Sequence, residues 1–111
     1  MMKKYLELER NDSATHMKVE LYYNLGGYNY FTGRQEERGY YLSVSPVQRE
    51  QRAGCMLESY TAFSGLKFLM NPVKRRSAKQ EAEAERIAAE RMDALVRVVL
   101  DKNGLRLAGE A

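Results

Sequence analysis

The sequence predicts an α+β domain, an antiparallel β-meander of about four strands followed by one long C-terminal helix packed on the sheet. Residues 17–25 alternate strictly, with Met17, Val19 and Leu21 on one face and polar side chains on the other. Residues from 78 to about 102 are rich in alanine, glutamate and arginine, which favour helix. Six of the eight tyrosines lie between residues 17 and 47, on or near strand-like runs.

The first three predicted strands follow one another through glycine-containing connections. Gly26 and Gly27 tolerate positive φ and suit a two-residue hairpin turn after the first strand, so residues 28–32 are expected to return as the second strand. The segment 33–39 is expected to be a charged connection. Residues 40–45 alternate again and form the third strand, which Pro46 ends or places at a sheet edge.

The fourth strand and the segments around it have weaker patterns. Residues 48–54 are polar and are expected to form a loop, and residues 55–64 the fourth strand. Leu66, Leu69, Met70 and Val73 have helical spacing, which predicts a short helical turn over 66–73.

The long helix has clear start and stop signals. Ser77 is a favourable N-cap with Gln80 three residues later, and Asn103-Gly104 is a favourable stop. About 25 residues at 1.5 Å each give a helix of roughly 38 Å, longer than a sheet of four short strands is wide. We therefore expect its apolar stripe to overhang the sheet and form a homodimer interface, with Met92, Leu95 and Val99 contributing.

A chain of 111 residues is expected to form one domain. We expect a loosely ordered N-terminal arm over 1–16, the α+β domain over 17–104 and a C-terminal tail over 105–111. Cys55 is the only cysteine, so no intramolecular disulfide can form, which favours a reducing compartment. Residues 1–9 lack the apolar segment of a secretory signal, and no apolar run is long enough to span a bilayer, so we expect a cytoplasmic protein without membrane contact.

Residues that would support catalysis or metal binding are sparse. His16 is the only histidine, and no nearby residue completes a nucleophile–base pair with it. One cysteine and one histidine cannot make a structural zinc site. The glycines match no phosphate-binding fingerprint. We expect a protein that is not an enzyme and has no catalytic residue, metal or cofactor.

The two halves of the chain differ in charge. Residues 17–79 contain ten basic and five acidic side chains, a balance of +5, whereas residues 80–111 contain five basic and seven acidic ones, a balance of −2. This asymmetry favours an anionic partner for the sheet half, although ordinary solvated charges would also produce it.

Exposed tyrosines beside arginines are typical of proteins that bind single-stranded nucleic acid. We expect Tyr28, Tyr30 and Tyr41 to stack on bases. The arginines expected to contact phosphates are Arg34, Arg38, Arg49 and Arg52. Two alternatives stay open. The tyrosines can pack beneath the helix or pair across strands because tyrosine favours sheets, or they can form the core of a protein–protein interface.

Several runs of the sequence resemble a group of small uncharacterised proteins encoded in bacterial genomes and mobile elements. The runs are GGYNYFTG from Gly26, RGYYLSVSPV from Arg38, SYTAFSGLKFLM from Ser59 and RRSAKQEAEAE from Arg75. This resemblance implies no activity and no site residue. The predicted topology is similar to the coactivator and Whirly type of single-stranded DNA-binding fold, which implies a curved sheet that meets nucleic acid and a helix that takes part in dimerisation.

Overall fold

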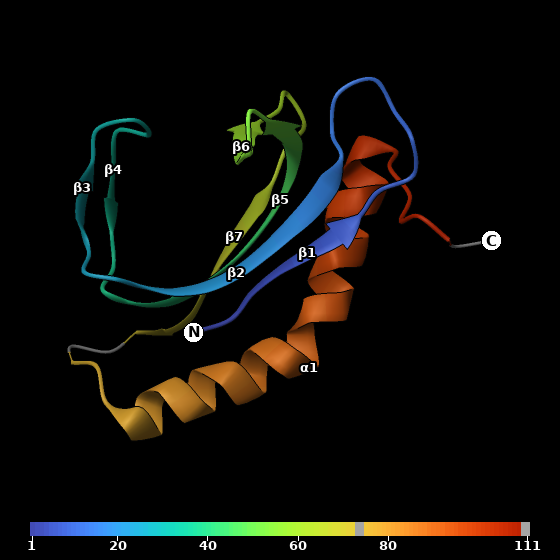
Figure 1. Cartoon of the computed structure of the whole chain (residues 1–111). Helices are drawn as coiled ribbons and strands as arrows, with labels where there is room; N and C mark the ends of the chain where they lie inside the picture. The colour runs from blue at the N-terminus through green and yellow to red at the C-terminus, as the bar shows by residue number, and fades with distance from the viewer. Residues whose placement is uncertain (73–74, 110–111) are drawn as a thin grey trace.

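The structure is a computed structural model that describes residues 1–72 and 75–109, and it consists of a curved antiparallel sheet, a small β-ribbon and one helix (Figure 1). The elements are β1 Lys3–Glu7, β2 His16–Asn24, β3 Gly27–Asn29, β4 Arg34–Glu36, β5 Gly39–Arg52, β6 Cys55–Tyr60, β7 Leu66–Pro72 and α1 Ala78–Asn103. The main sheet has the order β1-β2-β5-β6, β7 also pairs with β5, and β3 and β4 pair with each other. The predicted α+β class with a C-terminal helix is confirmed.

Strand β5 is the centre of the sheet, and two strands share one of its edges. Its first half, from Gly39 to Val44, pairs with β7, and its second half, from Val47 to Arg52, pairs with β6. Pro46 lies between the two halves, where its carbonyl oxygen accepts a hydrogen bond from the Thr61 hydroxyl at 3.3 Å. Proline has no N–H to donate, and this position does not need one. Pro46 therefore does not end the strand but lies at a local gap along its edge.

The hydrophobic core lies between one face of the sheet and α1. The directly paired residues Val19 and Val44, and Leu21 and Leu42, are buried on this face. The helix contributes its own buried side chains to the same cluster, Ala84, Ala88, Val96, Val99 and Leu100. Burying an aliphatic side chain of this size contributes about 1.5–3 kcal/mol, so the period-two pattern of β2 determines which sheet face the helix covers.

Helix α1 begins and ends as its capping residues predict. The Ser77 hydroxyl accepts a hydrogen bond from the Gln80 N–H at 3.1 Å, and Gly104 ends the helix with φ of 66°. Asn103 then ties the helix end to the loop before β7, because its side chain accepts from the Ser64 N–H at 2.9 Å and donates to the Ser64 carbonyl at 2.8 Å. Within the described residues, no helix is long and apolar enough to cross a membrane.

The apolar stripe of α1, for which the sequence predicts a dimer interface, packs against its own sheet. Val99 is completely buried, and Met92 and Leu95 pack against the core cluster. The sheet is strongly curved and follows the helix for most of its length (Figure 1). The stripe therefore does not extend beyond the sheet, although the comparison of helix length with sheet width predicted that it would. Met92 and Leu95 are only partly buried, and a homodimer through this helix stays a prediction.

The two ends of the chain meet at one sheet edge, which differs from the expected loose arm and tail. Residues 3–7 form β1, and Tyr5 pairs with Lys18 of β2. The C-terminal residues lie on the other side of this segment, where the Ala108 N–H donates to the Glu7 carbonyl at 2.9 Å. Residues 110–111 of the expected tail lie outside the described residues. The short β1 segment has no clear alternation, so its strand depends on the β2 backbone beside it.

Two further segments differ from the predicted secondary structure. Residues 48–52 extend β5, and only Ala53 and Gly54 form the turn of the β5–β6 hairpin. Residues 66–72 form β7 rather than a helical turn, and Val73 lies outside the described residues. A β-bulge at Met70 explains why the apolar residues have helix-like spacing. Leu69 pairs with Tyr41 and Asn71 pairs with Tyr40, so Met70 has no partner on β5. Apolar side chains thus occur on both faces of β7.

Candidate nucleic-acid interface

The β3–β4 ribbon continues the β2–β5 hairpin beyond a bend. Gly26 lies at this bend with φ of 80°, and a Cβ at this position would lie 3.0 Å from the Arg38 backbone nitrogen. Only glycine fits such a crossing without strain. Gly26 and Gly27 therefore bend the hairpin, whereas the sequence predicted that they form the turn that reverses it.

The chain reverses at residues 30–33, at the end of the ribbon. The Asn29 side-chain oxygen accepts from the N–H groups of Phe31 and Thr32 at 2.9 and 3.2 Å, and the Gly33 N–H donates to the Asn29 carbonyl at 2.8 Å. An asparagine that caps its own turn in this way holds the loop in one conformation. The expected second strand over 28–32 is thus a three-residue strand followed by this turn.

Three aromatic side chains project from the end of the ribbon, and we call Tyr28, Tyr30 and Phe31 the aromatic tip. Tyr28 and Tyr30 are 54% and 87% exposed, and Phe31 is fully exposed. The two tyrosine rings meet edge to face, with centroids 4.9 Å apart and planes at 77°. Phe31 is not among the predicted site residues, although it directly follows Tyr30 in the same turn.

A partly exposed ion pair holds the ribbon over the open face of the sheet, the face opposite α1 (Figure 1). The Glu36 carboxylate accepts from Lys67 Nζ at 2.7 Å, from Asn24 at 2.6 Å and from Asn29 at 3.1 Å. The Lys67, Asn29 and Asn24 hydrogen bonds together lower the pKa of Glu36 to about 2. Lys67 lies on β7 opposite Ser43 of β5, so this contact joins the ribbon to the main sheet.

Tyr41 lies on the open face but is not available for stacking on a base. Its ring stacks on Tyr22 with centroids 5.8 Å apart, and Lys67 Nζ lies 4.9 Å from its centroid. Its hydroxyl donates to the Glu37 carbonyl at 2.7 Å, and only 7% of the residue is exposed. Burial raises the pKa of Tyr41 and of Tyr22. Tyr41 therefore packs within the open face and stabilises it, which corrects its predicted role of stacking on a base.

A cavity of about 560 Å³ lies between the ribbon and the sheet. Arg34 lines it together with Lys67, Glu37 and the edge of Tyr41. Arg34 is exposed and, within residues 1–72 and 75–109, has no ion-pair partner. Arg38 is also exposed, and its Nε donates to the Leu25 carbonyl at 3.0 Å beside the bend. Of the four predicted arginines, Arg34 thus lies on the ribbon and Arg38 lies at its base.

The other two predicted arginines lie at the opposite end of the open face. Arg49 is eight residues beyond Tyr41 on β5, a separation of roughly 26 Å in an extended strand. Its guanidinium group stacks on the Tyr5 ring at 3.8 Å. Arg52 is exposed at the end of the strand and pairs with Glu50 at 2.9 Å. The structure therefore places Tyr28, Tyr30 and Arg34 on the ribbon and Arg38 at its base, whereas Arg49 and Arg52 lie at the other end of β5.

A charged network surrounds Glu58 beside Arg49. Glu58 accepts hydrogen bonds from Lys18 Nζ at 2.7 Å and from the Tyr5 hydroxyl. These bonds raise the pKa of Tyr5 and of Lys18, and they lower the pKa of Glu58 although burial acts in the opposite direction. Each group is thus held in its ordinary protonation state at neutral pH, which is typical of a structural network rather than of an acid–base pair.

Comparisons with protein-family models, with curated proteins and with solved structures find no match for this chain. The resemblance to small bacterial and mobile-element proteins, and the similarity to the Whirly type of fold, stay predictions. Within the described residues, no three His, Cys, Asp or Glu side chains are grouped closely enough to hold a metal ion.

Proposed function

We propose that this protein is a non-enzymatic module that binds single-stranded nucleic acid through the aromatic tip. The observation that supports this proposal is the exposure of Tyr28, Tyr30 and Phe31 on a ribbon whose conformation is fixed by Asn29 and Glu36. Stacking of a base on an aromatic ring contributes about 1–3 kcal/mol, and a ring that is already held in place loses little entropy on binding.

The charges near the tip support phosphate contacts of modest strength. Arg34 on β4 and Arg38 beside the bend are exposed, whereas the Lys67 ammonium is already paired with Glu36. Two phosphate contacts to a single strand predict a slope of about −1.4 for the logarithm of affinity against the logarithm of salt concentration. Stacking rather than charge then provides most of the binding free energy.

Fluorescence anisotropy with labelled single-stranded oligonucleotides of about 12 nucleotides tests the proposal. We expect saturable binding with the shallow salt slope given above. Replacing Phe31 or Tyr30 by alanine weakens binding by about fivefold to a hundredfold because one stacking contact is lost. Tyr60→Ala is the matched control, because Tyr60 is 76% exposed but lies on β6. Absence of binding at low salt, or an equal loss in Tyr60→Ala, would contradict the proposal.

A protein partner is a second candidate, and one observation favours it. Leu25, which directly precedes the bend at Gly26, is 70% exposed, and an aliphatic side chain contributes to a protein interface more than to base stacking. Many cations on the open face are already paired with carboxylates, which also suits a protein surface. Binding of this kind would depend little on salt, survive nuclease treatment and be lost in both Leu25→Ala and Phe31→Ala.

A further inference from the structure

Strand β6 forms an edge of the main sheet that no described segment covers. It pairs only with β5, and all of its residues, Cys55–Tyr60, are exposed. The edge at β1 differs, because the Ala108 N–H donates to the Glu7 carbonyl at 2.9 Å and Leu8 forms a β-bridge with Leu107. The C-terminal segment thus protects one edge of the sheet, whereas the outward backbone groups of β6 can pair with a further strand (Figure 1).

The side chains of β6 are apolar for an exposed edge strand. Met56 and Leu57 are each 49% exposed, and Tyr60 is 76% exposed. The strand contains no lysine and no proline, the residues that commonly keep an edge strand from pairing with another chain. Its pairing with β5 is regular, without a bulge that would twist the edge away. Such an edge is typical of a strand that pairs with another strand edge.

Glu58 is the one charged residue in the β6 sequence, and its charge is compensated within the chain. Its carboxylate lies 2.7 Å from Lys18 Nζ and 3.8 Å from Arg49 Nε. Two copies of β6 can therefore approach each other without an uncompensated negative charge on either strand.

A second copy of β6 fits this edge when the two strands run antiparallel about a two-fold axis at Leu57. In this register Leu57 lies opposite its own copy, Met56 opposite Glu58, and Cys55 opposite Ser59. Moving the axis to Glu58 would place two carboxylates directly opposite each other, which is unfavourable. Moving it to Met56 would carry the end of each strand past the hairpin turn of the other and shorten the pairing. The register about Leu57 avoids both problems.

We infer that β6 is the interface of a homodimer in which two copies pair edge to edge and extend the main sheet across a two-fold axis at Leu57. Backbone hydrogen bonds hold the two strands, and the paired Leu57 side chains bury apolar surface. Because the same edge is used by both copies, the assembly closes at two and does not form fibres. Strands of about 20 Å bury less than a standard interface, so the dimer dissociates on dilution. This interface is separate from the aromatic tip.

Sedimentation velocity over a range of protein concentrations tests this inference. We expect a reversible monomer–dimer equilibrium for the wild-type chain. Leu57→Lys places two ammonium groups opposite each other at the axis and is expected to weaken association by about tenfold or more. Val98→Lys is the matched control, because Val98 is 51% exposed but lies on α1, and it should leave association unchanged. A monomer at every concentration, or equal association in wild type and Leu57→Lys, would overturn the inference.

Cysteine cross-linking tests the register and decides the question if Leu57→Lys does not fold. In a Cys55→Ser background, Leu57→Cys places the only cysteine on the axis, where opposed Cα atoms are about 4.5–5.5 Å apart and can be joined by a disulfide. Oxidised glutathione should convert this variant to a covalent dimer. Tyr60→Cys in the same background lies far from its own copy and should stay monomeric. Equal cross-linking of the two variants, or none in either, would refute the assignment.

Discussion

Lys67 Nζ lies 2.7 Å from Glu36 Oε1, and this ion pair joins strand β7 of the main sheet to strand β4 of the ribbon. The two residues are 31 positions apart in the chain. Asn24 and Asn29 donate to the same carboxylate from the other side of the ribbon. The position of the aromatic tip over the open face therefore depends on a single carboxylate.

Low pH is expected to lower the free energy of unfolding because it protonates Glu36. The folded-state pKa is about 2, below the ordinary value of 4.5, so the unfolded chain binds more protons between these values. The stabilisation is present above about pH 4.5 and is lost as the pH falls through about 2. Because Glu36 is partly exposed, we expect a contribution on the order of 2 kcal/mol.

Urea denaturation at several pH values measures this contribution. Glu36→Gln should lower the free energy of unfolding at neutral pH and flatten its fall in acid. Glu37→Gln removes the same charge from the exposed neighbouring residue and should keep the wild-type profile. If Glu36→Gln retained the full acid dependence, the ion pair would not be its source.

Tyr41→Phe is expected to destabilise the fold by about 1 kcal/mol. The substitution removes the hydroxyl that donates to the Glu37 carbonyl at 2.7 Å in a buried place, while the ring remains stacked on Tyr22. Tyr30→Phe, at the exposed end of the ribbon, should change stability by less than about 0.5 kcal/mol. Thermal unfolding followed by circular dichroism compares the two, and an equal effect would contradict the different positions of these tyrosines.

Gly65→Ala is expected to destabilise the fold by about 1–3 kcal/mol. Gly65 lies where the chain passes from β6 to β7 against β5, and a Cβ there would lie 2.8 Å from the Ser45 hydroxyl oxygen and 2.9 Å from the Val44 carbonyl oxygen. The backbone oxygen cannot move aside without disturbing the β5–β7 pairing. Ser64→Ala adds no volume and keeps the backbone bonds to Asn103, so chemical denaturation should give a near wild-type value.

Ser77→Ala is expected to cost about 1 kcal/mol because it removes the acceptor for the Gln80 N–H. Ser77→Asp preserves an acceptor at the N-cap and should retain most of the stability. Urea midpoints of the two variants give the comparison. A Ser77→Asp variant as unstable as Ser77→Ala would show that the cap is not the source of the effect.

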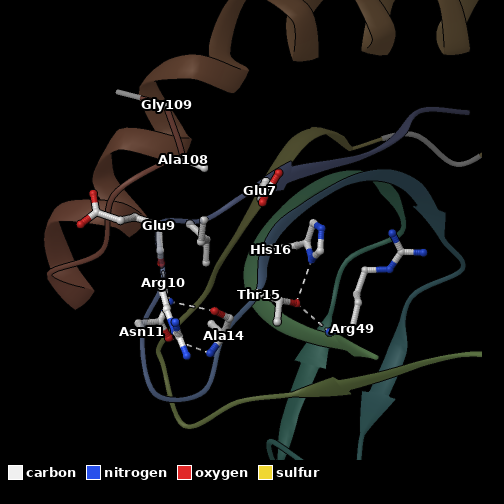
Figure 2. Close-up of a pocket in the computed structure, with 11 residues that line it drawn as sticks. Glu7, Glu9, Arg10, Asn11, Ala14, Thr15, His16, Arg49, Ala108 and Gly109 are labelled. Atoms are coloured by element: carbon white, nitrogen blue, oxygen red, sulfur yellow. Dashed lines mark hydrogen bonds between the residues drawn. The ribbon is translucent and has the colours of Figure 1, made fainter. Parts of the chain in front are cut away.

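Parts of the candidate site were predictable because exposure follows from local pattern. The sequence predicted Tyr28 and Tyr30 on an exposed strand and Arg34 in the charged connection after it, and the structure places all three on the ribbon. The roles of Tyr41 and Arg49 were not predictable, because each depends on partners from distant strands, Lys67 for one and Tyr5 for the other. The cavity lined by Glu7, His16, Arg49 and Ala108 also combines residues that lie far apart in the chain (Figure 2).

The elements whose secondary structure is specified by neighbouring residues could be predicted from the sequence alone. Strict alternation defines β2, and capping residues with a run of helix formers define α1, because these preferences act between residues a few positions apart. Tertiary contacts decided three other features of the fold. Residues of β1 and β7 form strands, β5 continues through Pro46, and the apolar stripe of α1 that includes Val99 packs against the sheet. The hydrogen bonds and apolar contacts of these segments involve residues far away in sequence, so the local periodicity does not predict them.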